Sequence, residues 1–448
     1  MSKRIKIEQL LLTAVLIGFL FPLTTSIAFL KLATWNIPAI VLVFWIALRG
    51  INRHRFKIGD FDIWDYSILA FGFIYSVMTL LGQDPIANFL FLTNYLFCFV
   101  LAIYIRRSWG TIITAKYLVL FSFITIGLES IIGLIQQITG SEFGNLSIYL
   151  GETPDSSDLR SIGETEMGRV HGTLGTGNLV GSWINMFLPF VIFSSQFIRS
   201  KSLWIWRNLT ILVAIMAIVL TISRFNTAIF VGILGFVFLL SIKNNFRTKI
   251  KLSIRRSTFT FVSFLLVLGI TTTVVYWDAV LMMKAAIEFR FSDTFEQVSS
   301  SGGSSSGVAA RMEMNKGALE AFIRSPILGA GFKNSRWIWP TVDAKVPAGW
   351  PYQPHNVYMI MLVEGGIFLF LVYALLTLYP FYRLWQNRET RDPFLIAFFL
   401  SLSACLGIQM IYITFTSGNF TAVYMLIQGA TMGYTDHLLK KQVKHDLQ

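Results

Sequence analysis

His355 is the residue of this chain best placed to transfer a proton. It follows a Pro-rich approach that ends in Pro354, and it directly precedes a long apolar run. An imidazole can accept a proton near neutral pH, which suits general-base activation of a hydroxyl group. Position alone favours this role no more than that of a histidine that caps the helix starting at Asn356.

Two arginines could bind an anionic group. Arg224 lies in Thr221-Ile-Ser-Arg-Phe-Asn-Thr227, between two apolar runs. A guanidinium at membrane depth is costly and is a functional-site hypothesis by default, and its planar fork suits phosphate oxygens. The alternative is a snorkelling arginine paired with Glu129 or Glu364. Arg311, early in a loop segment, is unremarkable by itself, because charged residues on loop helices are mostly solvated.

A glycine-rich segment, Arg169-Val-His-Gly-Thr-Leu-Gly-Thr-Gly-Asn178, precedes another apolar run. Its glycines permit close backbone approach to a ligand, and the helix N-terminus that follows could help hold a phosphate. Arg169, His171 and Asn178 are the candidate ligands. A flexible turn back into the membrane explains the same residues equally well.

Two acidic patterns suggest other chemistry. Glu129 and Glu364 lie inside apolar runs and could form a proton relay, as in a transporter, or could neutralise Arg224. Asp60-Phe-Asp62 imitates a metal-binding Asp-x-Asp motif. It stands ahead of a helix, where acidic residues favour the helix dipole, so we prefer a structural role. No other cluster of metal ligands is visible, and we expect no metal and no cofactor.

These residues must be positioned by membrane helices. The chain has 448 residues, of which 54% are hydrophobic and only 14% charged. Its apolar runs are about 20 residues long, the length that crosses the hydrocarbon core as a helix. We predict an all-α polytopic membrane protein with about twelve spans, at about 10–30, 35–48, 63–82, 86–105, 112–135, 178–198, 208–222, 226–241, 258–276, 356–380, 393–414 and 420–436.

Two connections are too long to be plain turns, at about 139–177 and 277–355. Long loops in compact proteins are usually functional or disordered. The second contains a Ser/Gly linker at 299–307 and a predicted helix from Val308 to Arg324, which Pro326 ends. We therefore predict five parts: membrane helices in 1–138, a first external loop in 139–177, membrane helices in 178–276, a large external loop in 277–355, and membrane helices with a tail in 356–448.

The net charge of +13 reflects the orientation of the chain in the membrane. The short connections rich in Lys and Arg all fall on one side, which the positive-inside rule makes cytoplasmic. Both termini, including a retained N-terminal apolar run, then face the cytoplasm, and both long loops face outside. We expect membrane lipids as neighbours and no nucleic acid. Cys98 and Cys405 lie in apolar runs, so we expect no structural disulfide.

The combined motifs resemble the bacterial O-antigen ligase and O-antigen polymerase superfamily. The resemblance rests on the segment from Arg169 to Asn178, on Thr221-Ile-Ser-Arg224, on Arg311 leading into Ser325-Pro-Ile-Leu-Gly-Ala-Gly-Phe332, and on His355-Asn-Val-Tyr358 running into Glu364-Gly-Gly366. It extends from the first long loop to the span after His355. One departure is Leu369, where the ligase version of the motif often has a further glycine.

The resemblance implies a membrane glycosyltransferase of the bacterial cytoplasmic membrane. Such enzymes move a glycan from a polyprenyl diphosphate carrier, here undecaprenyl diphosphate, to a saccharide or lipid-linked acceptor on the outer face, without a metal ion. Arg224 and Arg311 would hold the diphosphate, and His355 would accept the acceptor proton in an inverting displacement. Further candidate substrate ligands are Arg169, His171, Asn178, Arg336, Trp350, Tyr352 and Asn356.

Other functions remain open from the sequence. The close alternative is a polymerase of O-antigen or exopolysaccharide, which differs from a ligase only in its acceptor. A transporter of lipid-linked saccharide would need polar residues and broken helices at the membrane midplane. The central parts of most predicted spans are apolar, which disfavours transport. A structural scaffold would leave the external residues unexplained.

Overall fold

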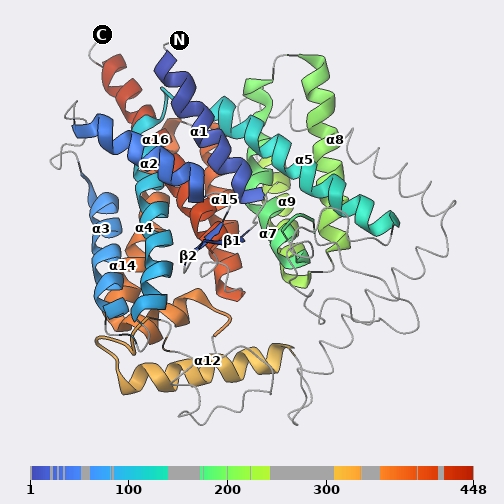
Figure 1. Cartoon of the computed structure of the whole chain (residues 1–448). Coiled ribbons are helices and arrows are strands. Elements are labelled where there is room, and N and C mark those ends of the chain that lie inside the picture. The colour runs from blue at the N-terminus through green and yellow to red at the C-terminus, as the bar shows by residue number, and fades with distance from the viewer. Residues whose placement is uncertain are drawn as a thin grey trace, which may run out of the picture. The chain divides into compact units, whose positions relative to one another are not determined.

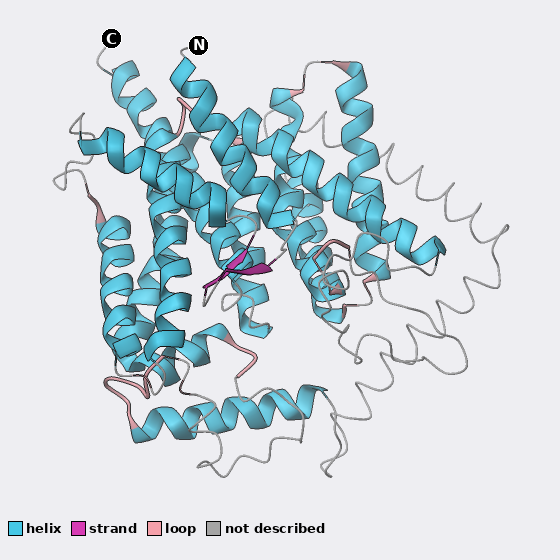
Figure 2. Ribbon diagram, viewed as in Figure 1, coloured by secondary structure: helices cyan, strands magenta, loops and turns pink. Residues whose placement is uncertain are grey.

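The structure is a computed structural model in which most apolar segments are described. The described residues are 3–20, 24–27, 30–33, 36–51, 61–80, 82, 85–139, 172–174, 176–198, 200–221, 223–242, 307–332, 334, 354–390, 392–411 and 418–446. The span predicted at about 258–276 lies outside them. Figure 2 shows these residues mainly as helices, with a few short loops and one small hairpin.

The chain divides into two compact units. Unit 1 comprises Met1–Ala115, Ser305–Arg391 and Cys405–Gln448, and unit 2 comprises Lys116–Ser304 and Asp392–Ala404. The described elements of unit 1 are α1 (Lys3–Leu20), β1 (Thr24–Ile27), β2 (Leu30–Ala33), α2 (Asn36–Ile51), α3 (Ile63–Leu80), α4 (Pro85–Ser108), α12 (Gly307–Arg324), α14 (Val357–Gln386), the 3₁₀ turn η4 (Arg388–Thr390) and α16 (Gly418–Asp446).

Unit 2 is helical wherever it has regular described structure. Its elements are α5 (Ala115–Thr139), α7 (Gly177–Ile192), the 3₁₀ turn η2 (Phe193–Phe197), α8 (Lys201–Leu220) and α9 (Arg224–Ile242). The boundary between the units cuts α15 (Pro393–Ile411) after Ala404. Aromatic rings fill the core of unit 2, where Phe190 packs against Phe394 and Phe398 with ring centroids 5.5 and 5.0 Å away.

Among the described residues, six helices are long and apolar enough to cross a membrane, in α3, α5, α7, α8, α14 and α15. A shorter apolar helix, Phe225–Leu240, lies within α9. Helices satisfy every backbone polar group within one segment, as hydrocarbon demands. The prediction of a polytopic α-helical membrane protein is confirmed, while the total of twelve spans stays a prediction.

The first predicted span, at about 10–30, is wrong in its second half. Helix α1 ends at Leu20, and the next described residues form an antiparallel hairpin in which Thr24 pairs with Ala33 and Ile27 with Leu30. The sequence supplies a reason, because Pro22 cannot continue a helix and β-branched residues follow it. Hydropathy alone gives little warning of the change, since apolar residues surround Thr24, Thr25 and Ser26 on both sides.

The core of unit 1 joins segments that lie far apart in the sequence. Helices α3, α4, α14 and α16 pack together, and Phe71 of α3 has Phe99 and Tyr373 as ring neighbours at 5.4 and 6.0 Å. Helix α16 approaches α4 closely at Gly429 and Gly433, where a Cβ atom on Gly433 would lie 2.9 Å from the carbonyl oxygen of Arg106. Small residues four apart are a common contact between membrane helices.

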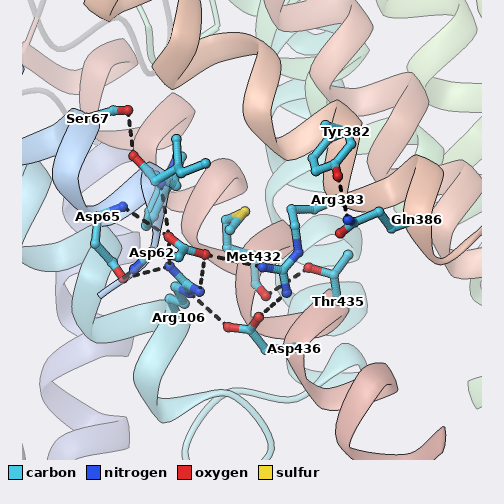
Figure 3. Close-up of polar contacts among 12 residues, drawn as sticks. Asp62, Asp65, Ser67, Arg106, Tyr382, Arg383, Gln386, Met432, Thr435 and Asp436 are labelled. Atoms are coloured by element: carbon cyan, nitrogen blue, oxygen red, sulfur yellow. Dashed lines mark hydrogen bonds and ion pairs between the residues drawn. The ribbon is translucent and has the colours of Figure 1, made fainter. Parts of the chain in front are cut away.

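Ion pairs connect these four helices at one end (Figure 3). Arg106 of α4 donates from Nε to Asp436 at 2.8 Å, from Nη2 to Asp62 at 2.7 Å and from Nη1 to Asp65 at 2.8 Å. Arg383 of α14 pairs with Asp62 at 3.2 Å and also with Asp436. We call Asp62, Asp65, Arg106, Arg107, Arg383 and Asp436 the charge cluster. Its three carboxylates face three guanidinium groups.

Asp62 thus has a structural role. Its Oδ1 accepts from the backbone N–H of Trp64 at 3.0 Å and so caps the start of α3. Burial alone would raise the pKa of Asp62, but the hydrogen bonds and positive charge of Arg106 outweigh burial and hold that pKa below its ordinary value. The N-terminal end of α1 and the C-terminal end of α16 lie at the same end of unit 1 as the charge cluster. Helix α12 lies at the opposite end (Figure 1).

Replacing Arg106 with alanine should destabilise the protein by about 3–5 kcal/mol, because buried Asp65 would lose its main ion-pair partner. Thermal unfolding of the purified protein in detergent measures the effect as a lower Tm. Arg388→Ala is the matched control: this side chain is half exposed and reaches Glu389 only at 4.0 Å, a kind of surface pair worth about 0–1 kcal/mol. Equal Tm values for the two variants would contradict the role of the cluster.

Candidate active site

His355 lies directly before α14, as the sequence predicts. The helix is capped by Asn356, whose side-chain oxygen accepts from the backbone N–H groups of Tyr358 at 2.9 Å and Met359 at 3.3 Å. The cap is therefore Asn356, which leaves the imidazole of His355 outside the helix, partly buried after the buried Pro354. The alternative that His355 itself caps the helix is wrong.

Arg311 and His355 lie in the same unit and interact electrostatically. The predicted loop helix is confirmed as α12, with Arg311 in its second turn. Burial of the imidazole, and next the positive charge of Arg311, lower the pKa of His355 from 6.5 to about 4. His355 is consequently neutral at physiological pH, the form that can accept a proton.

The turn that follows α12 forms backbone hydrogen bonds with α14 at a point where α14 is broken. Gly366 has φ 65° and ψ −163°, which interrupts the helix. The Gly-rich turn, residues 325–332, supplies backbone partners there: the N–H groups of Ala330 and Gly331 donate to the carbonyls of Val363 and Glu364 at 2.7 and 2.9 Å. Two motifs that the sequence presents 30 residues apart are thus in direct contact.

Arg224 is the first residue of α9, in unit 2. The start of α9 is fastened to α7 by the buried side chain of Asn226. Its Nδ2 donates to the carbonyl of Asn178 at 2.9 Å, and its own carbonyl accepts from Asn185 Nδ2 at 2.9 Å. Asn226 fixes the backbone two residues after Arg224, a role that sequence reasoning missed. The signal was an amide at the very start of an apolar run.

The glycine-rich segment is also anchored by a buried side chain. Glu129 of α5 accepts from the backbone N–H of Thr173 at 3.0 Å and from its hydroxyl group. Gln136 donates to the carbonyl of Gly172 at 3.1 Å and accepts from its N–H at 2.9 Å. The sequence suggests Glu129 as a partner of Arg224 or as part of a proton relay. In the structure its carboxylate accepts hydrogen bonds from Thr173, in the middle of this segment.

The candidate residues fall into three groups. Arg311, His355 and Asn356 lie in unit 1, whereas Arg224 and Asn178 lie in unit 2. The remaining candidates, Arg169, His171, Arg336, Trp350 and Tyr352, lie outside the described residues. Within the described part of the chain, no group of three His, Cys, Asp or Glu side chains could hold a metal ion.

The charge of Arg311 should be measurable in the titration of His355. We expect a pKa of about 4 for the native imidazole. Arg311→Gln should raise this pKa, because the variant lacks the positive charge that opposes protonation, and Arg311→Lys should leave it nearly unchanged. NMR titration of histidine-labelled protein, with His355→Gln to assign the signal, provides the measurement. The same pKa in the Gln and Lys variants would contradict the coupling.

Part of the chain matches a known protein family. Residues 209–374 match the model of a family described as O-antigen ligase. The match includes Arg224, Arg311, His355 and the break at Gly366. No curated protein matches the chain. The chain therefore carries an O-antigen ligase domain over residues 209–374, and this domain makes the protein a membrane glycosyltransferase.

Proposed function

We propose that the protein transfers a glycan from undecaprenyl diphosphate to a saccharide acceptor on the outer face of the bacterial cytoplasmic membrane. The observation that carries the proposal is an arrangement inside an O-antigen ligase domain: His355 lies partly buried directly before the membrane helix α14, and the positive charge of Arg311 acts on it. A reaction that activates a hydroxyl and expels a diphosphate can use this combination, with the imidazole as proton acceptor and the guanidinium as partner of the diphosphate. The termini then face the cytoplasm.

In the proposed reaction, a neutral nitrogen of His355 accepts the proton of the acceptor hydroxyl. The oxygen attacks the anomeric carbon of the donor from the face opposite the carrier, and the bond from that carbon to the diphosphate oxygen breaks with inversion. Arg311 and Arg224 stabilise the negative charge that grows on the departing diphosphate. Such electrostatic stabilisation is usually the largest single contribution to catalysis.

The remaining candidate residues are proposed to bind substrate. Arg169, His171 and Asn178 would contact the donor phosphates at the start of α7, where the positive end of the helix dipole favours anions. Trp350 and Tyr352 would stack against sugar rings, with Arg336 and Asn356 as hydrogen-bond donors. Trp337 and Trp339 could provide further stacking surfaces.

The acceptor decides between ligase and polymerase. We favour a ligase, which would take lipid A-core as acceptor, over a polymerase that extends another glycan chain. The observation that supports the polymerase as an alternative function is Leu369, which occupies the position where the ligase motif often has glycine. Leu369 is fully buried and fills the space beside Gly365, so a large residue belongs to the packing here.

Transport is disfavoured although α14 is broken. A transporter uses the backbone groups and carboxylates at such a break to hold its substrate or coupling ion. Here the carbonyls of Val363 and Glu364 accept from the Gly-rich turn, and the Glu364 side chain accepts from Tyr75. These bonds connect parts of the protein to one another.

His355→Ala should abolish glycan transfer, a loss of at least about 100-fold for removal of a general base. Purified protein in vesicles, supplied with lipid-linked glycan and acceptor, provides the assay. His437→Ala is the matched control, because His437 lies on α16 outside the candidate site. Normal transfer by the His355 variant would rule out the assigned role. Movement of unaltered glycan across the vesicle membrane would instead favour transport.

A deletion strain should separate ligase from polymerase. If the protein is a ligase, gel electrophoresis of lipopolysaccharide from the strain should show loss of all long chains attached to the core. A single repeat unit remaining on the core would identify a polymerase instead. Complementation with the native gene, but not with one encoding His355→Ala, should restore the pattern.

A further inference from the structure

We infer that Glu364 is a positioning residue for the reaction, and that it sets the place of His355 relative to Arg311. The inference rests on the proposed function, because it assigns Glu364 to the same site. We call Val357 to Gly365 the outer segment of α14. Glu364 lies next to its end, and His355 lies two residues before its start.

The break in α14 creates backbone groups that need partners. Besides the two bonds from Ala330 and Gly331, the N–H of Ile367 donates to the carbonyl of Pro326 at 2.9 Å. All three bonds go to the Gly-rich turn. Because an unpaired backbone group in hydrocarbon costs several kcal/mol, the turn and the outer segment must move together.

The turn fits closely against the break. Gly329 has φ 68°, and a Cβ atom there would lie 2.5 Å from the backbone nitrogen of Gly366. The hydroxyl of Ser325 donates to the carbonyl of Gly329 at 2.7 Å and closes the turn. Ser325 follows directly on Arg324, the last residue of α12, so the turn continues the helix that carries Arg311.

The side chain of Glu364 adds the link to α3. Glu364 is 1% exposed, and its Oε2 accepts from the hydroxyl of Tyr75 at 3.3 Å. The ring of Tyr75 packs against Phe332 at 4.5 Å, and the Phe332 backbone donates to the carbonyl of Met78 at 3.3 Å. Glu364 therefore lies where the outer segment, the Gly-rich turn and α3 meet.

These contacts connect Arg311 to His355 by a continuous path: α12, the turn, Glu364 and the outer segment. The nine residues of the outer segment form about 13 Å of helix. A small rotation at Glu364 would displace the imidazole at the far end. Misplacement of a reacting group by about 1 Å can cost about 100-fold in rate.

Substitutions of Glu364 test the inference in the glycan-transfer assay. Glu364→Gln keeps an oxygen that accepts from Tyr75 and should retain kcat within about threefold. Glu364→Ala should lower kcat by about 10- to 100-fold with little change in KM. Tyr75→Phe should lower kcat less, and the double variant should fall no further than Glu364→Ala. The acidic limb of the pH profile should be the same in the native protein and in Glu364→Gln.

Several outcomes would overturn the positioning role of Glu364. If Glu364→Gln is as inactive as Glu364→Ala, the carboxylate acts through its charge or proton. If Glu364→Ala is fully active while His355→Ala is inactive, the proposed function stands and the positioning role fails. Activity of His355→Ala would overturn the proposed function itself. Glu364→Gln and Tyr75→Phe, each with native Tm, give the answer even if Glu364→Ala does not fold.

Discussion

The structure of unit 1 depends on the satisfaction of backbone polar groups at the break in α14. A membrane helix normally pairs these groups internally, and Gly366 prevents that. The missing partners come from a turn that lies 30 to 40 residues earlier in the chain. Only glycine allows the backbones to approach so closely at Gly329 and Gly366, where any side chain would collide with the opposing backbone. The constraint therefore dictates both the residue types and the pairing of these two motifs.

This pairing explains how a loop and a membrane helix can share one site. Arg311 lies on a helix outside the spans, and His355 lies at the mouth of a span, yet the charge of one reaches the other. In unit 2, side chains form the corresponding hydrogen bonds: the amide of Asn226 binds α9 to α7, and the carboxylate of Glu129 accepts from Thr173. These buried polar side chains thus fix the backbone at Asn178, close to the start of α7, and at Thr173.

Sequence patterns predicted local features well. The loop helix expected at Val308 to Arg324 is Gly307–Arg324 in the structure, and His355 lies at a helix start. These features depend on hydropathy, capping and proline, which act over a few residues. The hairpin after Leu20 was missed because apolar residues surround Thr24, Thr25 and Ser26, so the run as a whole reads as apolar. The partner of Glu364 was missed because Tyr75 lies 289 residues away, a separation that no local pattern encodes.

The charge cluster has a consequence for the order in which the protein is made. When α4 leaves the ribosome, Asp62, Asp65, Arg106 and Arg107 already balance one another. Arg383 arrives with α14 and adds a positive charge, which Asp436 cancels only when α16 is synthesised. Until then, the charge cluster holds one more guanidinium than carboxylate. The last helix thus neutralises the charge that α14 brings, and its attraction to Arg383 and Arg106 gives it a defined place among helices that inserted long before it.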